Sequence, residues 1–164
     1  MVGSYGPYPE AAREDPAVAE PTDAWGLLAE GHPEQALDGF ARRALQAPLH
    51  ARPKLGYGLA AALAGDLERG VWAVRRAYRR NGAVAQGLSV DERLRPALEE
   101  LLLRYRAGLF EEGSRARDAG FMSAALRQLL GEPYAAQRAL ETALEQGDAS
   151  ESARALQHSL AASR

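Results

Sequence analysis

Apolar residues recur every three or four positions along most of this chain, which is the spacing of one face of an α-helix. The pattern is clearest over residues 33–47, 52–64 and 67–80, and it returns over residues 115–130 and 133–146. With a short first helix capped by Thr22 or Asp23, these segments predict three helical hairpins, over residues 22–47, 51–80 and 115–146. Two aromatic residues, Phe40 and Trp72, are expected in or beside the seams between helices.

Three turns between these helices repeat one pattern, in which a glycine is followed by a small residue five places on and a bulky apolar residue four beyond that. The turns begin at Gly31, Gly65 and Gly131. The first and second are 34 residues apart, and the second and third are 66 apart. A spacing near 34 is typical of stacked helical hairpins, because two short helices and two turns consume about that length. We expect Gly65 to have a positive φ, which glycine adopts at a helix end without steric cost.

These stretches resemble the tetratricopeptide repeat (TPR), whose 34-residue pattern has small residues at its eighth and twentieth positions. In windows that begin at residues 17, 51 and 117, small residues stand at both positions: Ala24, Gly58 and Ala124, then Ala36, Gly70 and Ala136. The large aromatic residue typical of the fourth position is missing from all three windows (Glu20, Lys54, Gly120). The resemblance covers residues 22–82 and 115–148 and implies an all-α, TPR-like α-solenoid of about eight helices.

The middle of the chain has lost the repeat pattern. Residues 81–89 predict a loop, and one irregular helix is expected over residues 90–109 in place of the two helices of a repeat. Ser89 and Glu92 have the spacing of a capping box at its start. The pattern leaves open whether residues 83–114 form one helix or two.

The two ends of the chain differ in character. Residues 1–21 contain four prolines, two of them beside tyrosines, which favours an extended or disordered segment. This segment is either a solvated leader or a tail whose tyrosines dock on a groove of the same chain or of a neighbour. At the other end a capping helix is expected over residues 149–162, begun by Asp148 with Glu151, and its polar outer side would close the repeat domain 22–164.

Composition narrows the class of protein. The chain has 164 residues, of which 46% are hydrophobic and 26% charged, as in a globular chain with room for one sizeable core. A net charge of −2 gives no reason to expect nucleic acid as a partner. Arginine greatly outnumbers lysine, which is associated with GC-rich bacterial genomes. No stretch has the apolar length of a membrane span. The compartment is left open: cytoplasmic as the sequence stands, periplasmic or exported if an N-terminal signal has been removed.

The search for catalytic chemistry finds no pattern. The three histidines, His32, His50 and His158, have no neighbour at metal-ligand spacing. The chain has no cysteine, so disulfides and thiol catalysis are excluded. There is also no nucleophile elbow and no glycine-rich phosphate loop. The sequence therefore predicts no enzyme, no catalytic residue, no metal and no cofactor.

One cluster of like charges needs an explanation. Arg75, Arg76, Arg79 and Arg80 form two pairs at i,i+4 spacing, each repulsive by a few tenths of a kcal/mol. Either acidic partners lie nearby, or the arginines face an anionic surface. A solvated outer face is the favoured interpretation, and nucleic-acid binding is disfavoured because no aromatic stacking platform accompanies the arginines.

The resemblance to TPR proteins also implies a function. In that family the first helix of each hairpin lines a concave groove, and the matching residues here are mostly apolar: Trp25, Leu28, Leu55, Leu59, Leu63, Phe121, Ala125 and Gln128. Their partner would be an apolar extended segment or helix of a protein or peptide. Alternatively, some of them are buried against the middle helix or the N-terminal segment.

We therefore expect a non-catalytic interaction module or adaptor. The alternative is a structural, self-assembling repeat protein, a homo-oligomer whose groove is filled by its own N-terminal segment.

Overall fold

The computed structural model describes residues 23–88 and 90–163, and all regular structure in this part of the chain is helical. It comprises eight α-helices and two short 3-10 helices: α3 (Ala24–Ala29), α4 (Pro33–Gln46), α5 (Arg52–Leu63), α6 (Leu67–Arg80), η2 (Glu92–Leu94), α7 (Arg95–Arg106), η3 (Ala107–Phe110), α8 (Ser114–Leu129), α9 (Pro133–Glu145) and α10 (Glu151–Ala162). The expected all-α fold with about eight helices is confirmed. The expectations for residues 1–21 and for Ser89 lie outside the described residues.

The glycine turns have the conformation that their pattern predicts. Gly31, Gly65 and Gly131 have φ values of 88°, 108° and 79°. At the second turn the Gly65 N–H donates to the Ala62 carbonyl and the Asp66 N–H donates to the Ala61 carbonyl. This pair of bonds satisfies carbonyls left free at the end of a helix, and the other two turns repeat it.

A fourth turn of the same kind, which the repeat pattern did not reveal, lies between α9 and α10. Gly147 has a φ of 91°, and the Asp148 N–H donates to the Ala143 carbonyl. The side chain that caps α10 belongs to Ser150, whose hydroxyl accepts from the Ala153 N–H. Asp148, expected as the cap, instead accepts from the N–H and the hydroxyl of Ser150. At the start of α3, Asp23 caps as expected by accepting from the Gly26 N–H.

Small residues let the helices of each hairpin approach closely. A Cβ atom added at Gly58 of α5 would lie 2.8 Å from the Gly70 carbonyl oxygen of α6, so no larger residue fits there without a shift of the backbone. Between α8 and α9 the same role falls to Gly120, where an added Cβ would lie 2.9 Å from the Ala143 nitrogen. Gly120 stands where the TPR pattern has a large aromatic residue.

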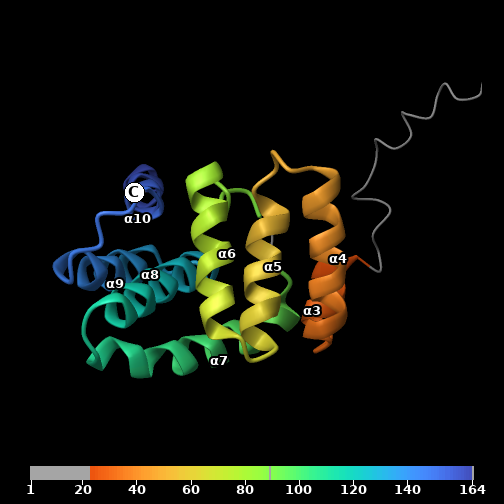
Figure 1. The fold of residues 1–164 in the computed structure, drawn as a ribbon, viewed down its shortest axis with the longest axis horizontal. Coiled ribbons are helices and arrows are strands. Elements are labelled where there is room, and N and C mark those ends of the chain that lie inside the picture. The colour runs from red at the N-terminus through yellow and green to blue at the C-terminus, as the bar shows by residue number, and fades with distance from the viewer. Residues whose placement is uncertain (1–22, 89, 164) are drawn as a thin grey trace, which may run out of the picture.

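The helices do not keep one direction through the chain. Figure 1 shows α4, α5 and α6 side by side, whereas α8 and α9 run crosswise to them and α7 lies along their lower ends. Contacts join α4 to α5, α5 to α6, α7 to α8, and α10 to both α6 and α9. The side-by-side order expected of a solenoid therefore extends to α6 and is interrupted by α7.

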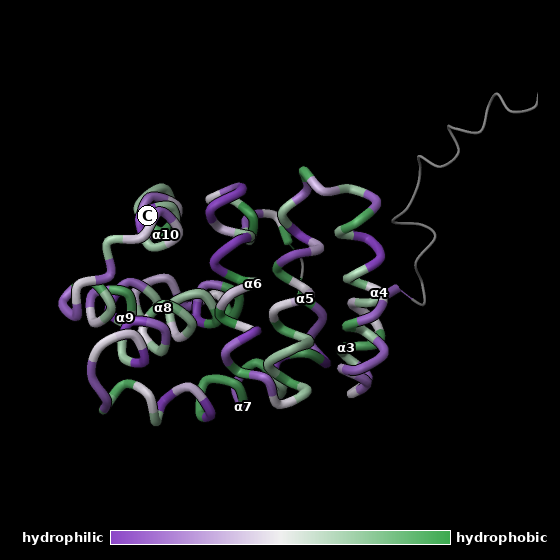
Figure 2. Tube along the Cα trace, viewed as in Figure 1, coloured by the Kyte–Doolittle hydropathy of each residue, from purple (hydrophilic) through white to green (hydrophobic). Residues whose placement is uncertain are grey.

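The segment without the repeat pattern folds as one α-helix, α7, between 3-10 turns that extend from Glu92 to Phe110. Its Leu94, Leu98 and Leu101 are buried and join one core cluster with residues of α5 and α8. Figure 2 shows the second half of α5 in hydrophobic colours, while hydrophobic and hydrophilic positions alternate along α6. Accordingly α5 is enclosed by its neighbours, and α6 keeps one side open to solvent.

Candidate interaction site

Most of the residues expected to line a concave groove lie in the core. Leu28, Leu55, Leu59, Phe121 and Ala125 are each at most 2% exposed. They belong to the same core cluster as the leucines of α7. Their burial therefore agrees with the alternative that such residues pack against the middle helix. In this structure they form no groove wall that a partner could contact.

The other three expected groove residues are half-buried. Gln128 belongs to a polar layer, because its side chain accepts from the Tyr78 hydroxyl and donates to the Ser159 hydroxyl, 3.0 Å away. Leu63 packs at the margin of the core. Trp25 alone borders a cleft, where its ring meets the Phe40 ring edge-on at a centroid distance of 4.9 Å.

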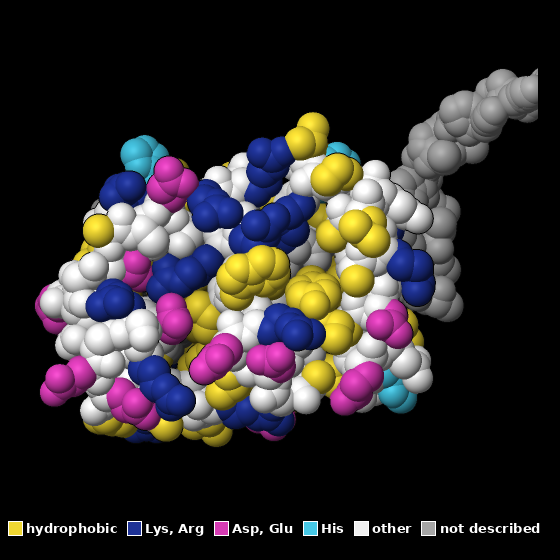
Figure 3. All heavy atoms as spheres, viewed as in Figure 1, with side chains coloured by type: hydrophobic (Ala, Val, Ile, Leu, Met, Phe, Trp, Pro, Cys, Tyr) yellow, Lys and Arg dark blue, Asp and Glu magenta, His cyan; other side chains and the backbone are white. Residues whose placement is uncertain are grey.

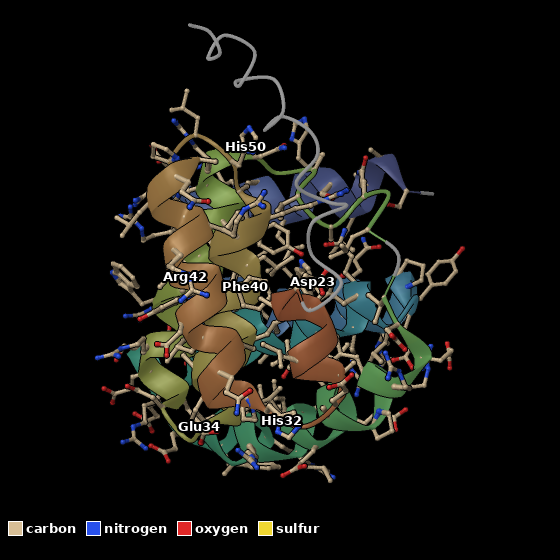
Figure 4. The ribbon with its side chains drawn as sticks, turned by 90° about the vertical axis from the view of Figure 1, so that its right-hand side faces the viewer. Asp23, His32, Glu34, Phe40, Arg42 and His50 are labelled. Atoms are coloured by element: carbon tan, nitrogen blue, oxygen red, sulfur yellow. The ribbon has the colours of Figure 1, made fainter. Side chains whose placement is uncertain are left out.

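The cleft beside Trp25 has a volume of about 710 Å³. It lies between the start of α3, the α4–α5 turn and the loop that follows α6. Figure 4 looks onto this side of the molecule and labels three residues of the cleft wall, Asp23, Phe40 and His50, with His50 uppermost. Its walls combine apolar and polar side chains: Asp23, Ala24, Trp25, Phe40, Arg43, Leu49, His50, Ala51, Arg52, Pro53, Asn81, Ala83, Val84, Gln86 and Leu88.

One wall of the cleft is held in place by hydrogen bonds from Arg52. Its guanidinium donates to the Gln86 carbonyl at 2.7 Å and to the Val84 carbonyl at 3.3 Å, which ties the loop after α6 to the start of α5. Val84 is 2% exposed and anchors the same loop in the core. The wall is therefore formed before any ligand arrives, which lowers the entropic cost of binding.

The opposite wall is positioned by Phe40. Its ring covers Gly56 of α5, where any side chain would overlap it, and only 2% of Phe40 is exposed. Trp25 rests against this ring and stays half-buried, so part of the indole is available to a ligand. The expectation that Phe40 lies in a seam is confirmed, whereas Trp72 is 58% exposed on the outer side of α6.

The Arg52 guanidinium places positive charge at the cleft, and its hydrogen bonds to two backbone carbonyls leave that charge unneutralised. The Asp23 carboxylate, also in the cleft wall, is engaged as the cap of α3. What the cleft offers is apolar contact area together with positive charge.

A second polar cluster, missed by the sequence reasoning, joins α6 to α8 and α10. The Arg75 guanidinium donates to the Asp118 carboxylate at 3.0 Å, to the Asp148 carboxylate at 2.8 Å and to the hydroxyls of Ser150 and Ser152 at 3.0 Å. It also lies 4.3 Å from the centroid of the Phe121 ring. Nearby acidic partners therefore explain why the charge of Arg75 is tolerated among the other arginines of α6. Arg75 links α6 to α8 and α10.

The described residues contain no group of three or more His, Cys, Asp and Glu side chains that could hold a metal ion. Within the same residues, no helix has the length and apolar character needed to cross a membrane. Comparisons of the chain with protein-family models, with curated proteins and with solved structures found no match.

Proposed function

We propose that this protein is a non-catalytic interaction module that holds a polypeptide segment in the cleft beside Trp25. The observation that carries the proposal is the cleft of about 710 Å³, whose walls are set by Phe40 and by the Arg52 hydrogen bonds. A rigid, partly apolar hollow of this size is typical of ligand sites. The TPR resemblance supports the same class of function, although the cleft is not the groove of that family.

The chemistry of the cleft favours an extended segment that carries an apolar and an acidic side chain. Trp25 and Leu49, the latter 71% exposed, would contact the apolar side chain. The positive charge of Arg52 would attract the acidic one. Aromatic and arginine residues at the centre of an interface contribute a large share of binding energy.

A structural alternative is favoured by one observation, the place where the described chain begins. Asp23, the first described residue, is itself part of the cleft wall, and 22 residues precede it in the sequence. Those residues include two tyrosines and four acidic side chains, which match the preferences of the cleft. In this alternative the N-terminal segment of the same chain, or of a second copy, fills the cleft in a self-assembled structure.

Photo-crosslinking separates the two proposals. A photoreactive phenylalanine analogue replaces Leu49 at the rim of the cleft, and the control places it at Leu103, which is 64% exposed on α7 and outside the cleft. An interaction module should crosslink through position 49 to a segment of another protein. That segment, made as a labelled peptide, should then bind the full chain at least tenfold more weakly after Leu49→Asp, and equally well after Leu103→Asp.

Crosslinks from position 49 to residues 1–22 of the same or a second copy would instead establish the structural alternative. Equal yields from positions 49 and 103, or a peptide that binds the two aspartate variants equally, would contradict a role for the cleft. Circular dichroism of each variant checks that the helical fold is retained.

A further inference from the structure

The outer side of α6 concentrates positive charge around an exposed tryptophan. Val71, Val74, Ala77 and Tyr78 turn to the core, whereas the opposite side of the helix carries Trp72, Arg76, Arg79 and Arg80. Figure 3 shows lysine and arginine side chains gathered over the upper ends of α5 and α6, next to exposed hydrophobic surface. We name the basic face as Lys54, Trp72, Arg76, Arg79 and Arg80.

The arginines of this face differ from the other arginines of α6. Arg75 is held by two carboxylates, and Arg69 pairs with Asp66. Within residues 23–88 and 90–163, Arg76, Arg79 and Arg80 make no ion pair with a carboxylate. All three charges are exposed, and Glu151, which lies across a hollow between α6 and α10 from Arg76 and Arg79, forms no ion pair with them.

Lys54 of α5 adds a fourth charge to the same face. Its ammonium donates to the carbonyls of Pro48 and His50, at 2.7 Å and 3.3 Å, which leaves its charge unneutralised. Burial and the charges of Arg76 and Arg80 lower the pKa of Lys54, so the lysine lies close enough to both arginines to be repelled by them. Crowding of like charges is unfavourable in the free protein and is relieved when an anion binds.

Trp72 gives the basic face an apolar group at one end. The Arg76 guanidinium lies 5.0 Å from the centroid of its ring, which orients the arginine beside the indole. Trp72 and Arg76 also border a hollow of about 320 Å³ between α6 and α10, together with Arg79 and with residues 150–152, among them the acidic Glu151. Tryptophan and arginine are the residue types that most often dominate binding at protein interfaces.

We propose that the basic face binds an acidic segment of a partner polypeptide, with carboxylates paired to Arg76, Arg79 and Arg80 and an apolar side chain beside Trp72. From Trp72 to Arg80 the helix rises about 12 Å, the length of roughly four residues of extended chain. A short acidic segment therefore covers the whole face. The basic face and the cleft beside Trp25 share no residue, so this surface is additional to the proposed function.

A polypeptide fits the face better than a nucleic acid. The whole chain has a net charge of −2, which opposes a long polyanion but not a short acidic segment that contacts only the basic face. Single-stranded nucleic acid is bound by a basic track with several aromatic side chains, one for each stacked base. Trp72 is the only aromatic residue of this face.

The test measures how a short fluorescein-labelled peptide binds to the full chain. The peptide consists of aspartate and glutamate with one leucine near one end. Anisotropy should show saturable binding that weakens at least tenfold when salt is raised from about 0.05 M to about 0.5 M. Arg76→Glu with Arg80→Glu should also weaken it at least tenfold. Arg42→Glu with Arg138→Glu is the matched control, because both arginines are exposed elsewhere and the net charge changes equally.

Trp72→Ala tests the apolar contact without changing charge, and it should weaken peptide binding several-fold. Equal losses in the Arg76/Arg80 pair and in the Arg42/Arg138 pair would overturn the proposal, since binding would then depend on net charge alone. An oligothymidine probe that binds more tightly than the peptide, and through Arg76 and Arg80, would reassign the face to nucleic acid and overturn it as well.

The chain's own acidic residues provide the last arm. When Glu10, Glu14, Asp15 and Glu20 are all changed to glutamine in the full chain, unchanged peptide affinity supports a separate partner. A gain in affinity well beyond that from the same change at Glu34, Glu112, Glu141 and Glu145, which are exposed elsewhere, would mean that the N-terminal segment already occupies the face. That result would overturn the proposal of a partner in trans. Trp25→Ala, which alters the cleft without changing charge, should leave peptide binding to the basic face unchanged, so failure here is distinguishable from failure of the cleft.

Discussion

The two interfaces of α6 differ in polarity. Toward α5, the contact is close and mainly apolar, with Gly58 and Ala62 of α5 against Gly70 and Val74 of α6. Toward α8 and α10, the contact is a polar layer. There Arg75 binds two carboxylates and two hydroxyls, and the Tyr78 hydroxyl donates to Gln128.

This difference shows which kind of helix–helix contact can be predicted from a sequence pattern. An apolar seam needs only complementary volumes at helical spacing, which local periodicity records. A polar seam needs each donor to find its acceptor, and the partners of Arg75 stand 43 and 73 residues further along the chain. Removing one partner of a buried charged pair is costly because the other is left unpaired.

The largest expected loss of stability comes from a substitution in the apolar core. Phe40→Ala removes a ring that is 2% exposed and packs on Gly56 and Trp25. The free energy of unfolding should fall by about 3–5 kcal/mol, as for other buried aromatic residues. Urea unfolding measures it, with Leu45→Ala on the same helix as the control, since Leu45 is 83% exposed. A loss below about 1 kcal/mol would contradict the packing described for Phe40.

The next substitution breaks the polar side. Arg75→Met keeps much of the side-chain volume but leaves Asp148, whose side chain is 4% exposed, without its cation. The free energy of unfolding should fall by about 3 kcal/mol. Arg79→Met, one turn later and exposed, should change it by less than about 0.5 kcal/mol. If both variants unfold at the same urea concentration, the polar layer contributes nothing to stability.

Lowering the pH should affect the polar interface of α6, because this interface contains the buried carboxyl group of Asp148. Burial raises the pKa of Asp148, but hydrogen bonds from Ser150 and Arg75 and the charge of Arg75 outweigh burial, so the pKa lies below its usual value. A carboxyl group of this kind stabilises the fold above its unfolded pKa of about 3.9, and that stability is lost as pH falls through the lower folded value.

The test compares the wild type with Asp148→Asn. At neutral pH the variant should be less stable by about 2 kcal/mol, the contribution of a hydrogen-bonded charge. Below about pH 4 the wild type should lose stability more steeply than the variant, and the two should converge. Parallel stability curves down to about pH 2 would show that Asp148 does not carry the acid sensitivity.

The smallest expected loss of stability comes from substitutions at the turn glycines, and it should be equal in the two halves of the chain. Gly65→Ala and Gly131→Ala each place a side chain at a positive φ, with open space around the new methyl group. Each should cost about 1 kcal/mol, since the cost is purely conformational. Thermal unfolding of the two variants provides the measurement. A cost at Gly65 several times larger than at Gly131 would mean that the two turns are not equivalent.

The sequence predicted the elements of this fold better than their arrangement. Turn glycines, caps and helical periodicity are local, so the positive φ of Gly65 and the helices that flank it followed from the residues around them. The crosswise placement of α8 and α9 is not local. It depends on how α7 fills the space beside α5, and α7 lacks the repeat pattern from which a direction could be inferred.

The candidate site was harder to predict for a related reason. Leu55, Leu59 and Phe121 have the spacing of groove residues, but the same spacing describes a core face once another helix covers it. Of the expected groove residues, Trp25 alone reaches the cleft, because its position follows from the Phe40 ring and not from the repeat. The loop wall formed through Arg52 depends on two backbone carbonyls, which carry no residue-specific pattern.

The chain has two tryptophans, and each stands at one of the two surfaces described above. Trp25 is half-buried against an aromatic ring at the cleft, whereas Trp72 is exposed beside a guanidinium on the basic face. Their emission should therefore differ in wavelength and in access to a soluble quencher such as iodide. With Trp72→Phe or Trp25→Phe, the intrinsic fluorescence of the remaining indole reports on a single surface, so occupancy of either can be followed without a label.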